Sequence, residues 1–147
     1  RGIALGREFG MFKPLEGGCL CGAVRYRVSQ APLDSGYCHC RMCQKTSGGP
    51  VQASAEIPAA GFAFIAGEAK AYRSSPNAVR HFCPNCGSQL TFRTLDDPTY
   101  VSINTPTLDD PNALPPRVHI WRKSRILWFE TSDDLPRYDR AGPALGQ

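Results

Sequence analysis

Apolar and polar residues alternate in short runs along most of this chain. In residues 23–28, three apolar residues occupy alternate positions and two arginines lie between them. A period of two is typical of a half-buried β-strand. The same pattern predicts further strands at 51–57, 62–65, 69–73, 79–83, 89–93, 100–104 and 118–121. Because Gly, Pro, Asn and Asp clusters separate these runs, we expect a mainly β domain of short antiparallel strands.

Helical signals are few and short. Residues 41–47 predict a helical turn, which Gly48 and Gly49 would close in a left-handed conformation. A second short helix could begin near Asp133 or Asp134. Residues 104–116 hold four prolines and little periodicity, so we expect a long surface loop there.

The length and composition favour one small globular domain. The chain has 147 residues, 41% of them hydrophobic, which is enough for a single core. No apolar run approaches the roughly 18 residues that a membrane-spanning helix needs. We predict a domain at 11–138 beginning at Met11, a disordered leader or expression remnant at 1–10, and a flexible tail at 139–147.

The N-terminal residues carry no apolar segment of the kind found in secretory signals, so a cytoplasmic location is expected. The formal charge of +4 counts every cysteine as neutral. Binding of two Zn²⁺ by seven thiolates would lower that charge to about +1. The sequence also lacks a run of five or more basic residues, so neither a nucleic acid nor a membrane partner is expected. The oligomeric state is left open.

Seven cysteines are the strongest chemical signal, and they fall into groups of two, three and two. The groups are Cys19 and Cys21; Cys38, Cys40 and Cys43; and Cys83 and Cys86. Their number is odd and below the density of disulfide scaffolds, and clustered thiols in a reducing compartment favour metal ligation.

Two ligand assignments compete. Cys40 and Cys43 could join the Cys83/Cys86 pair as a zinc ribbon. We prefer a closed structural zinc site made by Cys19, Cys21, Cys83 and Cys86, because Cys21 and Cys86 are each followed by a glycine that leads into an alternating strand.

Cys38, Cys40 and Cys43 would then supply three sulfurs, the ligand count of a catalytic zinc with an open fourth position. The alternative is a second structural zinc whose fourth ligand is a histidine such as His39 or His81. His39 could also be a proton shuttle or a packed surface residue, and His81 a donor beside the structural zinc. We interpret His119, Trp121, Trp128, Phe129 and Tyr138 as core residues.

Three ordered segments, 17–26, 38–48 and 82–87, with closing motifs at 119–121, 128–129 and 134–138, carry a family resemblance. Over about residues 16–138 the chain resembles the glutathione-dependent formaldehyde-activating enzyme family, which also contains centromere protein V. The resemblance implies a zinc-stapled β-tent fold, a structural zinc at the four cysteines and a catalytic zinc at the trio. This chain is shorter than the glutathione-using enzyme that names the family, so the fold carries over better than the substrate.

The resemblance also implies carbon-sulfur lyase activity, in which a zinc-activated thiol such as glutathione adds to a small aldehyde such as formaldehyde, or such an adduct is cleaved. A zinc held by three thiolates is a weak Lewis acid, but it still favours the deprotonated form of a bound thiol. The alternative is a non-catalytic interaction module in which both zinc ions are structural.

Overall fold

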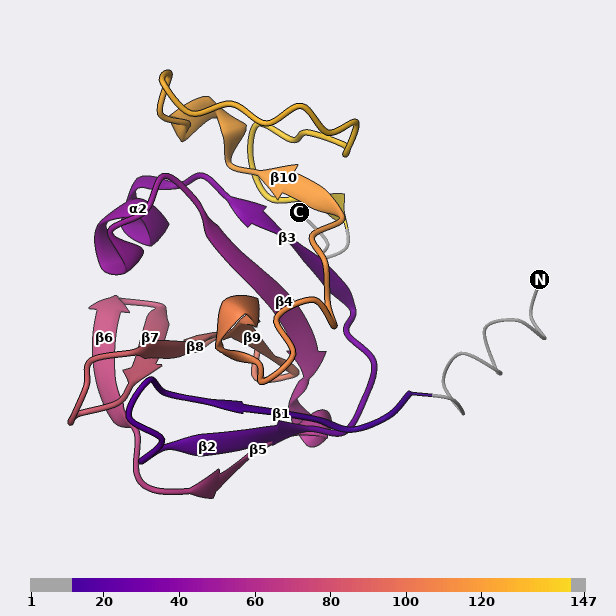
Figure 1. The fold of residues 1–147 in the computed structure, drawn as a ribbon. Coiled ribbons are helices and arrows are strands. Elements are labelled where there is room, and N and C mark those ends of the chain that lie inside the picture. The colour runs from indigo at the N-terminus through magenta and orange to yellow at the C-terminus, as the bar shows by residue number, and fades with distance from the viewer. Residues whose placement is uncertain (1–11, 144–147) are drawn as a thin grey trace.

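The computed structural model describes residues 12–143, in which the regular structure is almost entirely β (Figure 1). The strands are β1 (Leu15–Gly18), β2 (Arg25–Val28), β3 (Asp34–Cys38), β4 (Gln52–Pro58), β5 (Phe62–Ala66), β6 (Lys70–Ser75), β7 (Ala78–Phe82), β8 (Gln89–Thr94), β9 (Tyr100–Asn104) and β10 (Val118–Ile120). Helix α2 (Arg41–Ser47) follows β3, and the 3-10 helices are η1 (Ala59–Gly61), η2 (Thr105–Thr107) and η3 (Arg122–Ser124). The expected mainly β fold is confirmed, and all eight strands predicted from alternation are present with ends shifted by at most about two residues.

The strands form two sheets. The smaller is antiparallel, with the order β1-β2-β5, and the larger has the order β10-β3-β4-β9-β8-β7-β6. Every pair in the larger sheet is antiparallel except β10 with β3. Figure 1 shows the small sheet lying across the open side of the large one, which bends around it.

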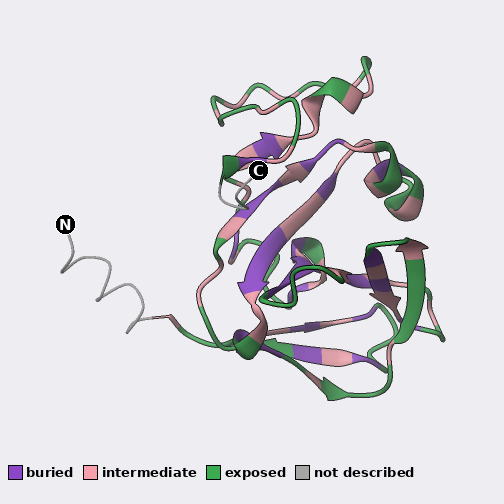
Figure 2. Cartoon of the chain, turned by 180° about the vertical axis from the view of Figure 1, so that it is seen from behind, coloured by how far each residue is buried: buried purple, intermediate pink, exposed green. Residues whose placement is uncertain are grey.

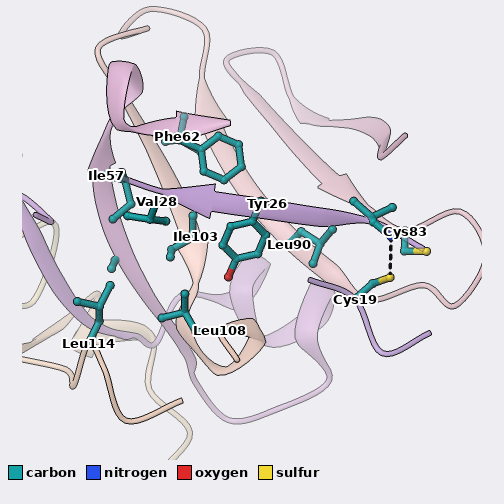
Figure 3. Close-up of a cluster of buried hydrophobic side chains, with 13 residues drawn as sticks. Cys19, Tyr26, Val28, Ile57, Phe62, Cys83, Leu90, Ile103, Leu108 and Leu114 are labelled. Atoms are coloured by element: carbon teal, nitrogen blue, oxygen red, sulfur yellow. Dashed lines mark hydrogen bonds between the residues drawn. The ribbon is translucent and has the colours of Figure 1, made fainter. Parts of the chain in front are cut away.

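The hydrophobic core fills the space between the sheets. Tyr26 and Val28 of the small sheet and Ile57 and Ile103 of the large sheet are completely buried in one cluster (Figure 3). The sulfur-bearing side chains of Cys19 and Cys83 lie at one end of the same cluster, so a cysteine group is built directly onto the core. Figure 2 shows burial concentrated on the strands, whereas α2 and the segment after β10 are largely open.

Two strands, β1 and β3, were not predicted. β1 has the sequence LEGG and β3 the sequence DSGYC, and neither shows apolar alternation. In β3 the polar Ser35 and the glycine Gly36 are both buried. Gly36 lies so close to β10 that a Cβ at this position would come within 2.8 Å of Val118. The absence of a side chain is what allows β10 to pair with β3, and hydrophobic periodicity does not report such close packing.

The helix predicted at 41–47 is confirmed, and Gly48 closes it with a φ of 72°. The second helix predicted near Asp133 or Asp134 is wrong. That segment is extended and bonds alongside β10, where the His119 N–H donates to the Pro136 carbonyl and the Tyr138 N–H donates to the His119 carbonyl. These hydrogen bonds to β10 pair backbone N–H and carbonyl groups that would have bonded to each other within a helix.

Residues 105–116 form a loop apart from the single turn of η2, but the prediction of a surface loop is only partly right, because Leu108 and Leu114 pack into the core. The predicted leader 1–10 and the predicted start at Met11 lie outside the described residues, as do 144–147 of the predicted tail. Within the described part of that tail, the Arg140 carbonyl accepts a hydrogen bond from the Trp121 N–H at 3.0 Å.

Candidate metal centres

Two similar turns carry the four-cysteine cluster. In the first, the Gly22 N–H donates to the Cys19 carbonyl at 3.1 Å, and in the second the Gly87 N–H donates to the Cys83 carbonyl at 2.8 Å. Gly22 and Gly87 have φ values of 80° and 79°, a conformation that glycine adopts without steric cost. The local similarity seen in the sequence thus reflects two turns that differ by one residue in length, each closed by a left-handed glycine, which present the cysteine pairs to each other.

The four sulfurs of Cys19, Cys21, Cys83 and Cys86 lie within 4.8 Å of one another. The Cys19 and Cys21 sulfurs are 3.6 Å apart, and those of Cys21 and Cys83 are 3.8 Å apart. A tetrahedral zinc with Zn–S bonds of about 2.3 Å would separate its sulfurs by about 3.8 Å. These spacings and the all-thiol donor set fit such an ion.

Backbone and side-chain donors already face these sulfurs. The Val24 N–H points at the Cys19 sulfur at 3.2 Å, and the Asn85 amide donates to the Cys21 sulfur at 3.2 Å. The pKa of Cys86 is lowered to about 5, first by the hydrogen bond from the Ser88 hydroxyl and then by the Ser88 backbone. Such donors stabilise thiolates, the form in which cysteine binds a metal.

The second cluster lies where β3 passes into α2. Cys38 ends the strand, Cys40 caps the helix with its sulfur accepting from the Cys43 N–H at 3.3 Å, and Cys43 occupies the first helical turn. Their three sulfurs also lie within 4.8 Å of one another. Among residues 12–143, no fourth cysteine, histidine or carboxylate joins this group, so the trio provides three ligand atoms.

The three thiols of the trio share negative charge unequally. The pKa of Cys38 is raised well above its ordinary value, because its thiol interacts with the sulfurs of Cys40 and Cys43 and is buried. The pKa of Cys40 is lowered by hydrogen bonds from Cys38 and Cys43. Cys40 is therefore the thiol most readily present as a thiolate.

His39 belongs to a different network from its two neighbouring cysteines. Its Nε2 lies 2.8 Å from Nδ1 of His119, whose Nε2 lies 3.1 Å from both carboxylate oxygens of Asp133. Since the ionised Asp133 only accepts, His119 donates from Nε2 and accepts from His39. Burial, followed by the proximity of His119, lowers the pKa of His39 to about 4. His39 is 1% exposed, so the interpretation as a surface histidine is wrong, and the core assignment of His119 is confirmed.

The remaining sequence candidates have ordinary contacts. His81 Nδ1 lies 3.3 Å from the Thr91 hydroxyl, and it is not among the clustered ligand atoms of the described chain. The core interpretation of Trp128 is wrong, because this side chain is 77% exposed, while Trp121, Phe129 and Tyr138 are half-buried. Trp121 has a φ of 57°, so the chain leaves β10 through a left-handed residue and turns away from the core.

An open cleft of about 420 Å³ lies beside the four-cysteine cluster, between α2 and the turn that carries Cys86. Its lining includes Thr46 of α2 and Cys86 of the four-cysteine cluster. On its floor the Gln52 amide donates to the Asn104 side chain at 2.9 Å, and the Asn104 amide donates to the Gln89 carbonyl at 2.9 Å. Gln52 pairs with Cys38 across β3 and β4, so the cleft borders the strand that ends in the trio, although the trio cysteines do not line it.

The sequence did not indicate the buried cation Arg80 of β7, which is 5% exposed. In the run Val79-Arg80-His81-Phe82, alternation places Arg80 on one face of a strand and gives no sign that this side chain is buried. Periodicity alone does not show whether the face of the large sheet opposite the core is covered by other parts of the chain.

No helix in the described chain is both long and apolar enough to cross a membrane.

Comparisons with known proteins identify a family and a similar fold. The model of the family described as glutathione-dependent formaldehyde-activating enzyme matches residues 14–124. A Halomonas elongata protein, provisionally named a glutathione-dependent formaldehyde-activating enzyme, is 33% identical over 125 residues, which cover 79% of this chain and 80% of that protein. A crystal structure of a Rhodobacter sphaeroides protein superimposes with a TM-score of 0.57 and 23% identity over 67% of this chain and 92% of that one, a likeness of fold. The chain therefore belongs to the glutathione-dependent formaldehyde-activating enzyme family.

Proposed function

We propose that the protein is a zinc-dependent carbon-sulfur lyase that joins a small thiol to a small aldehyde, or cleaves the adduct. The cysteine trio carries this proposal, because it offers three sulfurs and no fourth ligand among the described residues. Three protein ligands with one open position is the arrangement of catalytic zinc sites, whereas four closed ligands are typical of structural ones. We assign Cys38, Cys40 and Cys43 to a catalytic zinc, and Cys19, Cys21, Cys83 and Cys86 to a structural zinc.

A zinc at the trio would keep a thiol deprotonated at neutral pH. The thiolate sulfur attacks the aldehyde carbon, so a C–S bond forms while the C=O π electrons move to oxygen, which takes a proton from solvent. The product is an S-hydroxymethyl adduct when the aldehyde is formaldehyde. The reverse reaction breaks the C–S bond and returns the thiol and the aldehyde.

Glutathione and formaldehyde are the substrates that the family name suggests. The cleft favours a thiol of peptide character, because amide and hydroxyl side chains line it alongside Val51, Ala53 and Pro106. Gln52, Gln89 and Asn104 are fixed by hydrogen bonds to one another and can present polar groups to a bound ligand. These residues position a substrate, and the trio performs the chemistry.

The location that suits this chemistry is the cytoplasm. The seven cysteines are free, and Cys21 is exposed, so the clusters depend on a compartment that keeps thiols reduced.

A second function is favoured by one observation. Leu127 and Trp128 are adjacent and 82% and 77% exposed, which is unusual for large apolar side chains. If both ions were structural, this loop would be the contact surface of a zinc-stapled interaction module. Catalytic turnover decides between the two functions, because the module has none.

The test follows adduct formation from glutathione and ¹³C-formaldehyde by exchange NMR at equilibrium. The zinc-loaded protein should accelerate exchange between free and adduct carbon well beyond the uncatalysed rate. Protein depleted of metal should not, and readdition of zinc should restore the effect. Absence of acceleration with both zinc ions present would favour the interaction module.

A further inference from the structure

Helix α2, which carries Cys43, is attached to the rest of the protein without an apolar face. The one buried residue of this helix is Gln44, which is 4% exposed. A helix on a protein surface normally buries a stripe of apolar side chains instead. Within residues 12–143, one further side-chain hydrogen bond ties the helix to the large sheet, from the Thr46 hydroxyl to the Gln89 side chain at 3.3 Å. The position of Cys43 therefore depends largely on a buried amide.

The Gln44 amide joins α2 to two other segments of the chain. Its Nε2 donates to the His39 carbonyl at 2.7 Å and to the Ser124 carbonyl at 3.1 Å, and its Oε1 accepts from the Arg41 guanidinium at 2.6 Å. Carbonyls only accept and a guanidinium only donates, so these partners fix the orientation of the amide. Both N–H donors are used, as the burial of a polar group requires.

His39, which lies between two cysteines of the trio, is held from three directions. Its carbonyl accepts from Gln44, its N–H donates to the Ile120 carbonyl at 3.0 Å, and its ring Nε2 lies 2.8 Å from Nδ1 of His119. The N–H belongs to the peptide unit shared with the preceding cysteine, and the carbonyl belongs to the one shared with the following cysteine. These hydrogen bonds therefore hold the backbone of both neighbouring ligands.

The Gln44 side chain is the connection between the two parts of the trio. Cys38 and Cys40 flank the segment that the amide grips, and Cys43 precedes Gln44 directly on the helix. The spacing of the three sulfurs thus depends on a bond that involves none of the sulfurs. Groups that orient metal ligands in this way commonly change metal affinity by 10- to 100-fold when they are replaced.

We propose that Gln44 is the positioning residue of the trio centre: its amide fixes Cys38 and Cys40 relative to Cys43, and so sets the affinity and geometry of a metal bound there. This inference rests on the proposed function, because it assigns a metal to the trio. Gln44 exchanges no proton or electron pair with a substrate. It acts through the ligands, by holding their backbone.

The test uses protein in which both metals have been exchanged for Co²⁺, whose visible absorption reports ligand geometry. A competing chelator removes the ions, and the affinity of each step is measured. Gln44→Met keeps a long unbranched side chain and lacks both N–H donors. The affinity of the weaker step should fall by about tenfold or more, and the absorption bands of that ion should change shape. The tighter step should stay within about twofold of the wild type.

Ser35→Ala is the matched control for the loss of a buried hydrogen bond. Ser35 lies in β3, the strand that ends in Cys38; it is 3% exposed, and its hydroxyl donates to the Pro115 carbonyl at 2.7 Å. This variant also removes a side-chain donor from a backbone carbonyl, but the lost bond does not reach the junction of β3 and α2. Both metal affinities should equal those of the wild type. If Gln44→Met does not fold, Gln44→Glu replaces it, because a carboxylate keeps the acceptor for Arg41 and lacks both donors.

Equal affinity of the weaker step in the wild type and the donor-lacking variant would overturn the role of Gln44. An equal loss of affinity in Ser35→Ala would overturn it too, because that result indicates general destabilisation of the fold. A wild-type protein that binds only one Co²⁺ per chain would instead contradict the metal assignment of the proposed function, so the two failures are distinguishable.

Discussion

At the residue scale, the two cysteine clusters differ in how much chain each one ties together. Cys19 and Cys86 come from distant parts of the sequence and meet beside the core, whereas Cys38 and Cys43 belong to one strand–helix junction. A metal that closes a long loop contributes more to folding than one that closes a short loop. The same type of substitution should therefore have different effects in the two clusters.

Cys86→Ser is expected to destabilise the fold. The variant leaves three ligands for an ion that connects both turns, and the melting temperature should fall by about 10 °C or more. Thermal unfolding followed by circular dichroism measures this. A melting temperature equal to that of the wild type would defeat the structural assignment of this cluster.

Cys40→Ser is expected to separate stability from activity. The melting temperature should stay within about 3 °C of the wild type, because the trio closes almost no loop. Adduct exchange by NMR should fall by about a hundredfold or more, because the ion loses one of three ligands. If Cys40→Ser unfolds as readily as Cys86→Ser, the trio is structural and the interaction module becomes the better function.

Glu56 should make stability depend on pH. Burial, then the neighbouring Asp34, raises its pKa from 4.5 to about 7. The folded protein therefore holds this proton between about pH 4.5 and 7 while the unfolded chain does not, so the contribution to stability is present at low pH and lost as the pH rises to about 7. Relative to the wild type, Glu56→Gln should gain roughly 2 kcal/mol of unfolding free energy between about pH 5.5 and pH 8. Urea unfolding of both proteins measures these free energies. A difference between variant and wild type that does not change with pH would contradict a raised pKa at Glu56.

At the element scale, the attachment of β10 to β3 depends on the missing side chain of Gly36. Gly36→Ala places a Cβ within 2.8 Å of Val118, so β10 must move and stability should fall by about 2 kcal/mol. Hydrogen exchange of the His119 amide, which bonds to Pro136, should quicken. Gly48→Ala is the control: it meets open space at a φ of 72° and should cost about 1 kcal/mol without affecting that amide. Unchanged exchange in Gly36→Ala would show that β10 does not require the close approach.

The strands that sequence reasoning found are those whose side chains alternate between core and solvent. Strand β2 carries that signal, with Tyr26 and Val28 buried and Arg27 exposed, whereas in β9 the alternation is in the sequence only, because Tyr100 and Ser102 are buried as well. β1 and β3 carry glycine where another strand approaches, which leaves no hydrophobic period to detect. The false helix near Asp133 arose because acidic residues also occur in extended segments that bond to a strand.

The cysteine clusters were predictable because ligand spacing and the glycines after Cys21 and Cys86 are local features. The His39–His119 pair was not, because it depends on contact between segments far apart in the chain, and the burial of Arg80 was not, because alternation does not report which face is covered. Alternation shows that a residue lies on a particular face, but it does not show whether that face is covered.

At the scale of the whole molecule, the large sheet contributes residues to both candidate centres, one on its core side and one on its opposite face. The four-cysteine cluster joins the core between the sheets, whereas Cys38 of the trio points to the opposite face of the large sheet. In the proposed assignment, a metal at the four cysteines holds the fold and a metal at the trio keeps an open position for a ligand. The central claim is therefore that the two metals differ in role and in accessibility.

Stepwise chelation tests that claim most directly. Zinc content, circular dichroism and adduct exchange are measured together while a chelator is added to protein that begins with two zinc ions per chain. The account predicts that one zinc leaves early, that adduct exchange is lost with it, and that the fold persists until the second zinc leaves. Simultaneous loss of both ions with unfolding, or persistence of adduct exchange after the first ion has left, would contradict it.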